Sequence, residues 1–267
     1  MTSAPVTLTI AGSDPSGGAG IQADLKTFAA FKVYGAAVVT ALTAQNTCGV
    51  RAVMEVPPSL VAQQIDAVLD DLEVAATKTG MLATGAIIEV VAERLRARPA
   101  GVVVVDPVMV ATSGDPLLSA DALQMLRSRL LPLAALVTPN LHEAGVLLGR
   151  SIASSAEMRD AARALVDLGP RAALVKGGHR RAADGTLAPD ALDVLYDGST
   201  LHELTAPRAG FRAIHGAGCT LSAAVAAAVA RGHALIDAVR IAKDYVRRAI
   251  ERAPGLGSGA TPLAHDV

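Results

Sequence analysis

Short runs of apolar, often β-branched residues alternate with longer segments of helical periodicity along most of this 267-residue chain. Some short runs, such as Val102 to Val105, are apolar at every position, which is typical of strands buried on both faces of a parallel sheet. The alternation predicts an α/β fold with a mostly parallel central sheet and helices on both faces. The predicted strands are Val6 to Ile10, Ala36 to Thr40, Ala75 to Thr79, Gly101 to Val105, Ala135 to Val137 and Ala172 to Val175; the predicted helices are Ala19 to Phe31, Ser59 to Leu72, Gly85 to Ala97, Ala120 to Leu130 and Ala156 to Leu168.

The pattern changes after Val175, where a polar loop precedes two short extended pieces and two long helices. We expect the extended pieces to add antiparallel strands at one edge of the sheet. No proline-rich or charged linker interrupts the chain, so residues 1–267 are predicted to form a single domain. The extended pieces are Asp193 to Tyr196 and Leu201 to Thr205, and the helices are Gly218 to Ala230 and Ile236 to Arg252.

The composition excludes several classes of protein. An apolar fraction of 51% excludes disorder as the main state, and the longest apolar run, Leu221 to Ala230, is about half as long as a membrane span. A net charge of -1 and an aromatic content of 2% argue against a nucleic-acid partner, which needs basic patches and stacking side chains. The two cysteines, Cys48 and Cys219, cannot build a disulfide scaffold, so we expect a cytoplasmic protein.

A glycine-rich turn, Gly12 to Gly20, follows the first predicted strand and leads into a helix. Glycines let the backbone approach a ligand closely, and the amides at a helix N-terminus favour anions. A simple tight turn is an equally good interpretation of this segment alone. The turn lacks the G-x-G-x-x-G spacing and the chain has no Gly-Lys dipeptide, which excludes the dinucleotide fingerprint and the Walker A loop.

Polar residues follow three later strands, where an open α/β sheet binds its ligands. Asp106, Asn140 and Glu143 could together hold a hydrated Mg²⁺, which prefers oxygen ligands and bridges substrate phosphates. Asp and Asn are also ordinary turn residues, and Asn140 could simply cap the next helix. Lys176, followed by Gly177 and Gly178, could meet a nucleotide phosphate, although a lone lysine at a strand end is more often solvated.

The segment Ile214 to Leu221 carries the sharpest signal, because its glycines precede a long apolar helix. Backbone amides and the helix dipole would there form an anion hole. Cys219 lies in the first turn, where we expect its thiolate to be stabilised, so that it could act as a base or a nucleophile. His215 lies before this turn and is expected to hold backbone. The glycine-rich stretch Gly255 to Gly259 follows a helix and is predicted to be a tail.

Seven motifs, in order along nearly the whole chain, resemble those of the hydroxymethylpyrimidine/phosphomethylpyrimidine kinases of thiamine biosynthesis, within the ribokinase-like superfamily. The motifs are AGSDPSGGAGIQADLKTF from Ala11, TALTAQNT from Thr40, KTGML from Lys78, DPVMVATSGD from Asp106, TPNLHEA from Thr138, VKGGH from Val175 and HGAGCTLSAA from His215. The resemblance implies a ribokinase-like fold and an ATP- and Mg²⁺-dependent kinase. Its substrate would be 4-amino-5-hydroxymethyl-2-methylpyrimidine, phosphorylated first to the monophosphate and then to the diphosphate.

The resemblance also implies roles for individual residues. In this family a cysteine replaces the aspartate base of other ribokinase-like enzymes, and Cys219 occupies that place. The transferring phosphoryl would meet the amides of Gly216, Ala217 and Gly218, and Mg²⁺ would be organised by Asp106, Asn140 and Glu143. ATP would bind at Lys176, Gly177 and Gly178, and the aminopyrimidine at Gly12, Asp24, Gln45, Met81 and Val108. Dimers are common in the superfamily, so a homodimer is expected.

One departure from the family and three rival functions bear on this interpretation. Ala217 stands where the family commonly has threonine; because the hole is built from backbone amides, we expect an effect on rate rather than on identity. A pyridoxal kinase is the first rival, against which Gln45 argues because its amide suits a pyrimidine edge. A hydrolase or transferase with Cys219 as nucleophile is the second, and a ligand-binding module without turnover is the third.

Overall fold

The computed structural model describes residues 4–110, 117–119, 121–178, 180–182, 184–209 and 213–267. Three sequence predictions extend beyond these ranges. The second half of the motif that begins at Asp106, the first residue of the helix predicted from Ala120 and the last residue of the motif that begins at Val175 lie outside the described residues.

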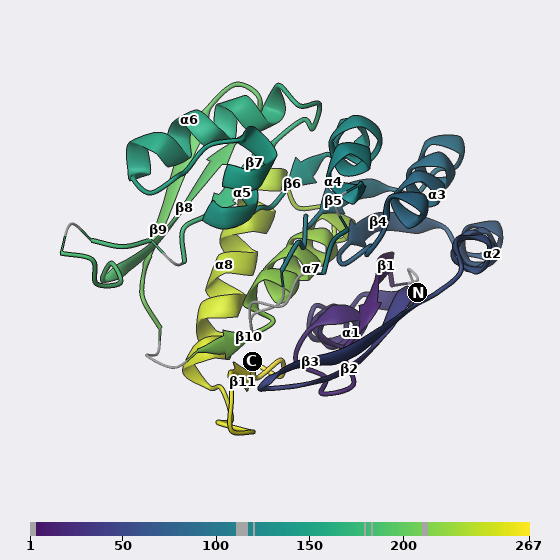
Figure 1. The fold of residues 1–267 in the computed structure, drawn as a ribbon, viewed down its shortest axis with the longest axis horizontal. Helices are drawn as coiled ribbons and strands as arrows, with labels where there is room; N and C mark the ends of the chain where they lie inside the picture. The colour runs from purple at the N-terminus through teal and green to yellow at the C-terminus, as the bar shows by residue number, and fades with distance from the viewer. Residues whose placement is uncertain (1–3, 111–116, 120, 179, 183, 210–212) are drawn as a thin grey trace.

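Within the described residues, one sheet of nine strands runs in the order β3-β2-β1-β4-β5-β6-β7-β8-β9 (Figure 1). The six strands from β2 to β7 in this order are parallel, and β3, β8 and β9 add antiparallel pairs at the two edges. The predicted mostly parallel sheet with antiparallel additions is confirmed. The strands are β1 Val6–Ser13, β2 Tyr34–Asn46, β3 Gly49–Glu55, β4 Val74–Thr79, β5 Val102–Val105, β6 Leu136–Val137, β7 Ala173–Lys176, β8 Asp190–Tyr196 and β9 Leu201–Pro207.

Helices cover both faces of the sheet, as the sequence predicts (Figure 1). Val103 and Val105 of β5 pack on the side of α2 to α6, whereas Val104 packs on the side of α7 and α8. The strand is apolar at every position because both of its faces are buried. The helices are α1 Gly20–Ala30, α2 Pro58–Asp71, α3 Gly85–Ala97, α4 Ala122–Met125, α5 Leu141–Leu148, α6 Ser155–Val166, α7 Ala217–Ala230 and α8 Leu235–Glu251.

Helix α7 lies against the centre of the sheet and contacts β1, β4 and β5 as well as α1 and α8. Its residues from Thr220 to Ala228 are buried, and most of them are alanines. Small side chains let the helix approach both the sheet and the neighbouring helices closely. The composition of α7 therefore reflects burial on all sides.

Two sequence predictions are wrong in detail. The helix predicted to end at Leu130 is α-helical to Met125 and then continues as a π-helical turn, Leu126–Leu130, and a short 3₁₀ turn. Pro132, which has no amide hydrogen, lies inside this 3₁₀ turn and cannot extend an α-helical hydrogen-bond ladder. The predicted tail Gly255 to Gly259 leads instead into a short strand, β11 (Thr261–Pro262), that pairs in parallel with β10 (Ile214–His215).

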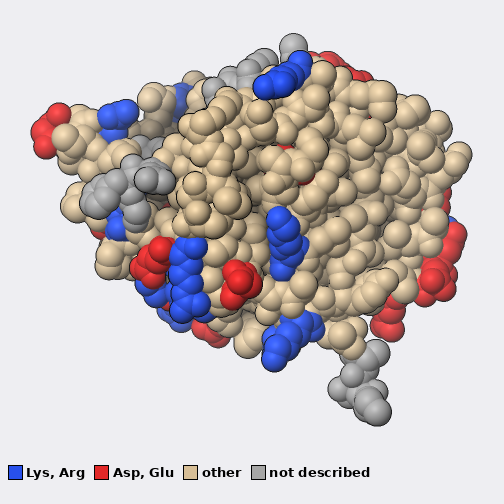
Figure 2. Space-filling view, turned by 90° about the horizontal axis from the view of Figure 1, so that it is seen from below, with Lys and Arg blue, Asp and Glu red and all other residues tan. Residues whose placement is uncertain are grey.

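The surface carries charges of both signs. Figure 2 shows blue and red side chains scattered over a mostly uncharged face, so the described part of this face carries no broad patch of a single sign. Among the helices that the structure describes, none is both long and apolar enough to cross a bilayer.

Candidate active site

A cavity of about 1280 Å³ opens where the parallel strands end. Its lining includes Ser13 at the end of β1, Met81 after β4, Asp106 after β5, Asn140 after β6 and Lys176 at the end of β7. The first turn of α7 also lines it. This is the crevice at the carboxyl ends of the strands where open α/β sheets bind ligands.

The cavity gathers most of the predicted site residues. All but two of them lie in its lining; the exceptions are Asp24 and Gly177. Gly177 donates its amide to Asp193 Oδ1 at 2.9 Å and packs so closely on β8 that a Cβ atom would lie 2.1 Å from the carbonyl oxygen of Leu192. The lining members are Gly12, Gln45, Met81, Val108, Asp106, Asn140, Glu143, Lys176, Gly178, Gly216, Ala217, Gly218 and Cys219.

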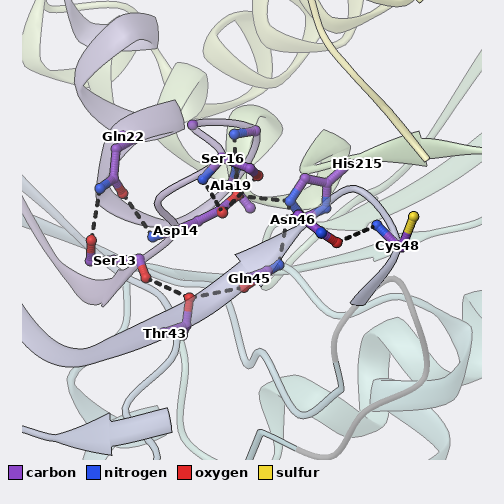
Figure 3. Close-up of polar contacts among 12 residues, drawn as sticks. Ser13, Asp14, Ser16, Ala19, Gln22, Thr43, Gln45, Asn46, Cys48 and His215 are labelled. Carbon is purple, nitrogen blue, oxygen red and sulfur yellow. Dashed lines mark hydrogen bonds and ion pairs between the residues drawn. The ribbon is translucent and has the colours of Figure 1, made fainter. Parts of the chain in front are cut away.

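The part of the cavity beside β1 and β2 combines one amide with apolar side chains. Met81 packs with Val108, and Gly12 lies so near Met81 that a Cβ would be 3.0 Å from its sulfur. Thr43 donates its hydroxyl to the Ser13 carbonyl at 2.9 Å and lies 3.3 Å from Gln45 Oε1 (Figure 3). An amide held at the edge of an apolar slot is suited to a flat, heteroaromatic ring.

Asp14 and His215 form a buried pair that the sequence analysis did not assign to the site (Figure 3). His215 Nε2 donates to Asp14 Oδ2 at 2.8 Å and lies 3.4 Å from Gln45 Nε2. Asp14 also accepts from the amide and hydroxyl of Ser16 and from the amide of Ala19. Burial opposes charge on Asp14, but the hydrogen bonds from His215 and Ser16 outweigh it and hold the pKa of the carboxyl below its usual value.

Asp24 lies behind the cavity wall, paired with Lys78. Both side chains are fully buried, and Lys78 Nζ lies 2.9 Å from Asp24 Oδ2, which also accepts the Thr9 hydroxyl at 2.6 Å. Burial raises the pKa of Asp24, and although burial acts against charge on Lys78, the carboxylate of Asp24 raises the pKa of that lysine. Lys78 is therefore a cation that lines the cavity, while the expected contact of Asp24 with a substrate stays a prediction.

The first turn of α7 approaches the turn after β1 closely. Gly216 has a φ of 83°, and a Cβ there would lie 1.8 Å from the carbonyl oxygen of Gly18, so no other residue fits. A Cβ on Gly218 would lie 3.0 Å from Lys176 Nζ. A first helical turn, whose amides have no partner within the helix, and a lysine thus lie together where the sequence predicts an anion hole.

Cys219 departs from the expected chemistry. Burial raises the pKa of its thiol to about 11, and the carboxylates of Asp106 and Asp24 add to this, whereas the positive charge of Lys78 acts in the opposite direction. The expected stabilisation of the thiolate by the helix N-terminus is outweighed by these effects. In the free protein Cys219 is a thiol.

The three predicted metal ligands lie together, and one of them also caps a helix. Asn140 Oδ1 accepts the Glu143 amide at 2.9 Å, and Glu143 Oε2 accepts the Asn140 amide at 2.8 Å, which is a capping box. Asp106 accepts from Lys176 Nζ at 3.0 Å. Burial, with a contribution from the charge of Asp106, raises the pKa of Glu143 to about 7.

This donor set fits Mg²⁺ better than a metal that needs a closed cage. In the part of the chain that the structure describes, no three His, Cys, Asp or Glu side chains cluster as a set of direct ligands. Two buried carboxylates, Asp106 and Glu143, nevertheless face a cavity with room for water and phosphates. Mg²⁺ keeps several waters and is commonly bound by one or two carboxylates plus substrate phosphates.

Two more lining residues lie beyond Lys176, toward β8 and α8. Lys243 Nζ contacts Asp193 Oδ2 at 2.5 Å and the carbonyl oxygen of Ala191 at 2.9 Å. Neither charged residue is predicted from the sequence, because each lies inside a regular element and only the fold brings β8 and α8 together. They line the end of the cavity near β8, whereas Gln45 lines the end near β2, toward the other edge of the sheet.

The family model for phosphomethylpyrimidine kinase matches residues 14–264 of the chain. The chain belongs to this family. A curated hydroxymethylpyrimidine/phosphomethylpyrimidine kinase of Rhizobium meliloti is 52% identical over 263 residues, which cover 97% of this chain and 96% of the relative. The phosphomethylpyrimidine kinases are phosphotransferases, and this chain is one of them.

Solved structures show the same fold in two related groups of kinases. The phosphomethylpyrimidine kinase of Clostridium difficile is 40% identical with a TM-score of 0.81, covering 92% of this chain and 99% of that one. The pyridoxal kinase of Staphylococcus aureus in complex with AMP-PCP and pyridoxal is 36% identical with a TM-score of 0.88, covering 99% and 94%. The predicted ribokinase-like fold is confirmed, with a nucleotide analogue bound in one of these neighbours.

The high pKa of Cys219 generates a prediction about its reactivity. Near neutral pH, iodoacetamide should modify the exposed Cys48 much faster than Cys219, because a thiol with a pKa of about 11 is almost entirely protonated there. The modification rate of Cys219 should rise by about tenfold for each added pH unit below its pKa, since the thiolate is the reactive form. Peptide mapping by mass spectrometry measures both rates; equal rates at neutral pH would contradict the assignment.

Proposed function

We propose that the protein transfers the γ-phosphoryl group of ATP to the hydroxymethyl group of 4-amino-5-hydroxymethyl-2-methylpyrimidine and then phosphorylates the resulting monophosphate. The observation that carries this proposal is the order of the site along the sheet. Gln45 lies on β2, helix α7, which would supply the anion hole, lies against β1, β4 and β5, and Lys176 ends β7. A ring site and a nucleotide site would therefore meet at Cys219.

The ring would lie in the slot beside β1 and β2. Its amine is a donor and its ring nitrogens are acceptors, and the single amide of Gln45 can answer both. Met81 and Val108 would cover the ring, and Gly12 leaves room for it. Asp24 would act through Lys78, which it holds at the cavity wall, in addition to its expected role toward the pyrimidine.

Phosphoryl transfer needs positioning and neutralisation of charge. The substrate oxygen would attack the γ-phosphorus, the bond to the β-phosphate oxygen would break, and ADP would leave. The amides of Gly216, Ala217 and Gly218, together with Lys176, would stabilise the charge on the transferred group. The proton of the hydroxymethyl group would pass to Cys219 Sγ in its thiolate form; burial raises the pKa of this thiol to about 11, and the positive charge of Lys78 limits the increase.

ATP and Mg²⁺ would bind on the side of β5 to β8. Lys176 and Gly178 line this part of the cavity, and Gly177 fixes the turn between them. Asp106, Asn140 and Glu143 would hold the hydrated Mg²⁺. When bound, the ion neutralises the phosphate oxygens of ATP.

A pyridoxal kinase activity is the second candidate, supported by the similarity to the Staphylococcus aureus enzyme in complex with pyridoxal. Gln45 favours the pyrimidine, because a pyridine ring with a phenolic oxygen presents a different set of donors and acceptors to an amide. We propose pyridoxal as a slow substrate at most.

The experiment that tests the proposal measures ADP release with Mg-ATP and three acceptors: the hydroxymethylpyrimidine, its monophosphate and pyridoxal. We expect turnover with both pyrimidines and little with pyridoxal. Cys219→Ser should lower kcat by about 100-fold or more, because a serine hydroxyl is far harder to deprotonate than a thiol and so supplies almost none of the basic form. Cys48→Ser, a matched change of an exposed cysteine, keeps a hydrogen-bonding group beside Ser258 and should leave kcat unchanged. Turnover of pyridoxal alone, or no ADP with any acceptor, would refute the proposed function.

We also propose that two copies, each a single domain, form a homodimer through the β2–β3 edge. Met54 of β3 and Tyr34 of β2 are 62% and 59% exposed, although both are large apolar side chains. Apolar groups on an unpaired edge strand favour association with another chain.

The two free thiols agree with the cytoplasmic setting that the sequence predicts.

Light scattering after gel filtration tests the dimer. The wild-type protein should have twice the mass of one chain, and Met54→Glu should shift it to the monomer because a buried charge at the interface is unfavourable. Leu187→Glu, at an exposed leucine outside this edge, is the matched control and should stay dimeric. A monomeric wild-type protein would refute the dimer.

A further inference from the structure

The chain end returns to the active site. We call residues 256–265 the C-terminal strap. In Figure 1 this segment, at the yellow end of the chain, passes the tip of the β2–β3 hairpin and β10. The Ala260 amide donates to the carbonyl oxygen of Thr47 at 2.9 Å, and the Gly259 amide lies 3.3 Å from the Thr47 hydroxyl. Ser258 Oγ lies 3.1 Å from Cys48 Sγ. The strap therefore holds the turn of the hairpin.

The hairpin is weakly supported where it carries Gln45. The ladder between β1 and β2 ends with the pair Ser13 and Leu42, and β2 continues beyond it as far as Asn46, paired with β3. Within one chain, the strand β3 lies at the edge of the sheet and is exposed from Arg51 to Glu55. A two-stranded ribbon is marginally stable alone. The proposed dimer would cover this edge, but within one chain Gln45 depends on contacts at the hairpin tip.

The strap also holds the other side of the same slot. Its strand β11 pairs with β10, with Thr261 opposite Ile214 and Pro262 opposite His215. His215 in turn contacts Asp14 and lies 3.4 Å from Gln45 Nε2, so the two sides meet in the network of Figure 3. One short segment is therefore bonded to both chain segments that place this network.

The end of the strap is anchored in the interior. His265 Nε2 lies 3.1 Å from the hydroxyl of Thr220, the residue after Cys219. The His265 carbonyl oxygen accepts the Tyr245 hydroxyl at 2.8 Å, and Leu263 is buried. Anchoring on α7 and α8 gives the strap a fixed path from which it can hold the hairpin.

Glycine is required at the contact with the hairpin. A Cβ on Gly259 would lie 2.0 Å from the Thr47 carbonyl oxygen, and one on Gly257 would lie 2.3 Å from the Thr47 hydroxyl. These distances are too short for any side chain. The glycine-rich sequence of the strap therefore reflects a close fit to the hairpin.

We propose that the C-terminal strap is a positioning element that fixes Gln45 and His215 for binding of the pyrimidine ring. The inference rests on the proposed function, because the ring is assigned to this slot. The strap touches neither the anion hole amides nor Lys176 through the bonds described above, so it should affect acceptor binding and leave nucleotide binding unchanged.

The first test is Gly259→Ala, which should push the strap away from Thr47. We expect KM for the hydroxymethylpyrimidine to rise by about tenfold, with KM for ATP unchanged. Hydrogen exchange without substrate should become faster at residues 43–47 and 213–215. Gly232→Ala is the matched control. Gly232 has a φ of 90° and nothing lies within 4 Å of a Cβ there, so this substitution adds backbone strain at the far end of α7 without a steric clash. It should leave the pyrimidine KM and the hydrogen exchange of residues 43–47 and 213–215 unchanged.

The outcomes separate the strap from the proposed function. No turnover by the wild-type protein would count against the proposed function. Turnover by the wild-type protein with an unchanged pyrimidine KM in Gly259→Ala would overturn the positioning role of the strap. Unchanged hydrogen exchange at residues 43–47 would also overturn it, whether or not the enzyme turns over. An equal rise of both KM values, or the same changes in Gly232→Ala, would show a general loss of stability and overturn it too.

A second variant tests the strap without loosening it. Ser258→Cys places a thiol beside Cys48, and oxidation should join the strap to the hairpin. Because a positioning element stays in place through the catalytic cycle, we expect the oxidised variant to keep its kcat and pyrimidine KM within about twofold. A loss of activity that a reductant restores would show that the strap must detach, and would overturn the proposal.

Discussion

The close contact between two glycine-lined backbones is the constraint on which this active site depends. Gly216 approaches the carbonyl oxygen of Gly18 to a distance that leaves no room for a side chain, and Gly20 packs on Gly12 in the same way. The first contact joins the turn after β1 to the start of α7, and the second joins the two ends of that turn. Because the alanines of α7 hold that helix against the centre of the sheet, its amides face the ends of the parallel strands.

Charge in the site is balanced before any ligand binds. Lys78 is paired with Asp24 and Lys176 with Asp106, and all four side chains are buried or nearly so. A buried charge without a partner lowers the stability of the folded protein. Within each pair, one side chain therefore holds the other in place. The pairs hold two cations in the cavity that the first turn of α7 also lines, without leaving them free to move. Phosphoryl transfer requires preorganised charge of this kind.

Much of the fold can be predicted from local sequence, and the strands that cannot be predicted have physical reasons for it. Buried strands such as β5 are apolar throughout, and helices such as α3 carry clear periodicity, so both are predicted. The strand β3 is exposed on both faces and has no apolar pattern, and β11 is two residues long and paired across more than forty positions. Such pairing depends on tertiary contacts that local periodicity does not contain.

The site residues divide in the same way. Strand ends and glycines identified the cavity lining, because the topology of a parallel sheet brings its carboxyl ends together. The Asp14–His215 pair joins residues 201 positions apart, and the pKa of Cys219 depends on burial and on three charged neighbours from other elements. Neither can be obtained from spacing along the chain.

In the proposed reaction, two ligands meet at the first turn of α7. A crystal structure of the protein with Mg²⁺, a non-hydrolysable ATP analogue and the hydroxymethylpyrimidine would show whether they do. We expect the terminal phosphate on the amides of residues 216–218, the ring beside Gln45 and Met81, and the hydroxymethyl oxygen within hydrogen-bonding distance of Cys219 Sγ. A terminal phosphate outside this turn, or a hydroxymethyl group directed away from Cys219, would contradict it.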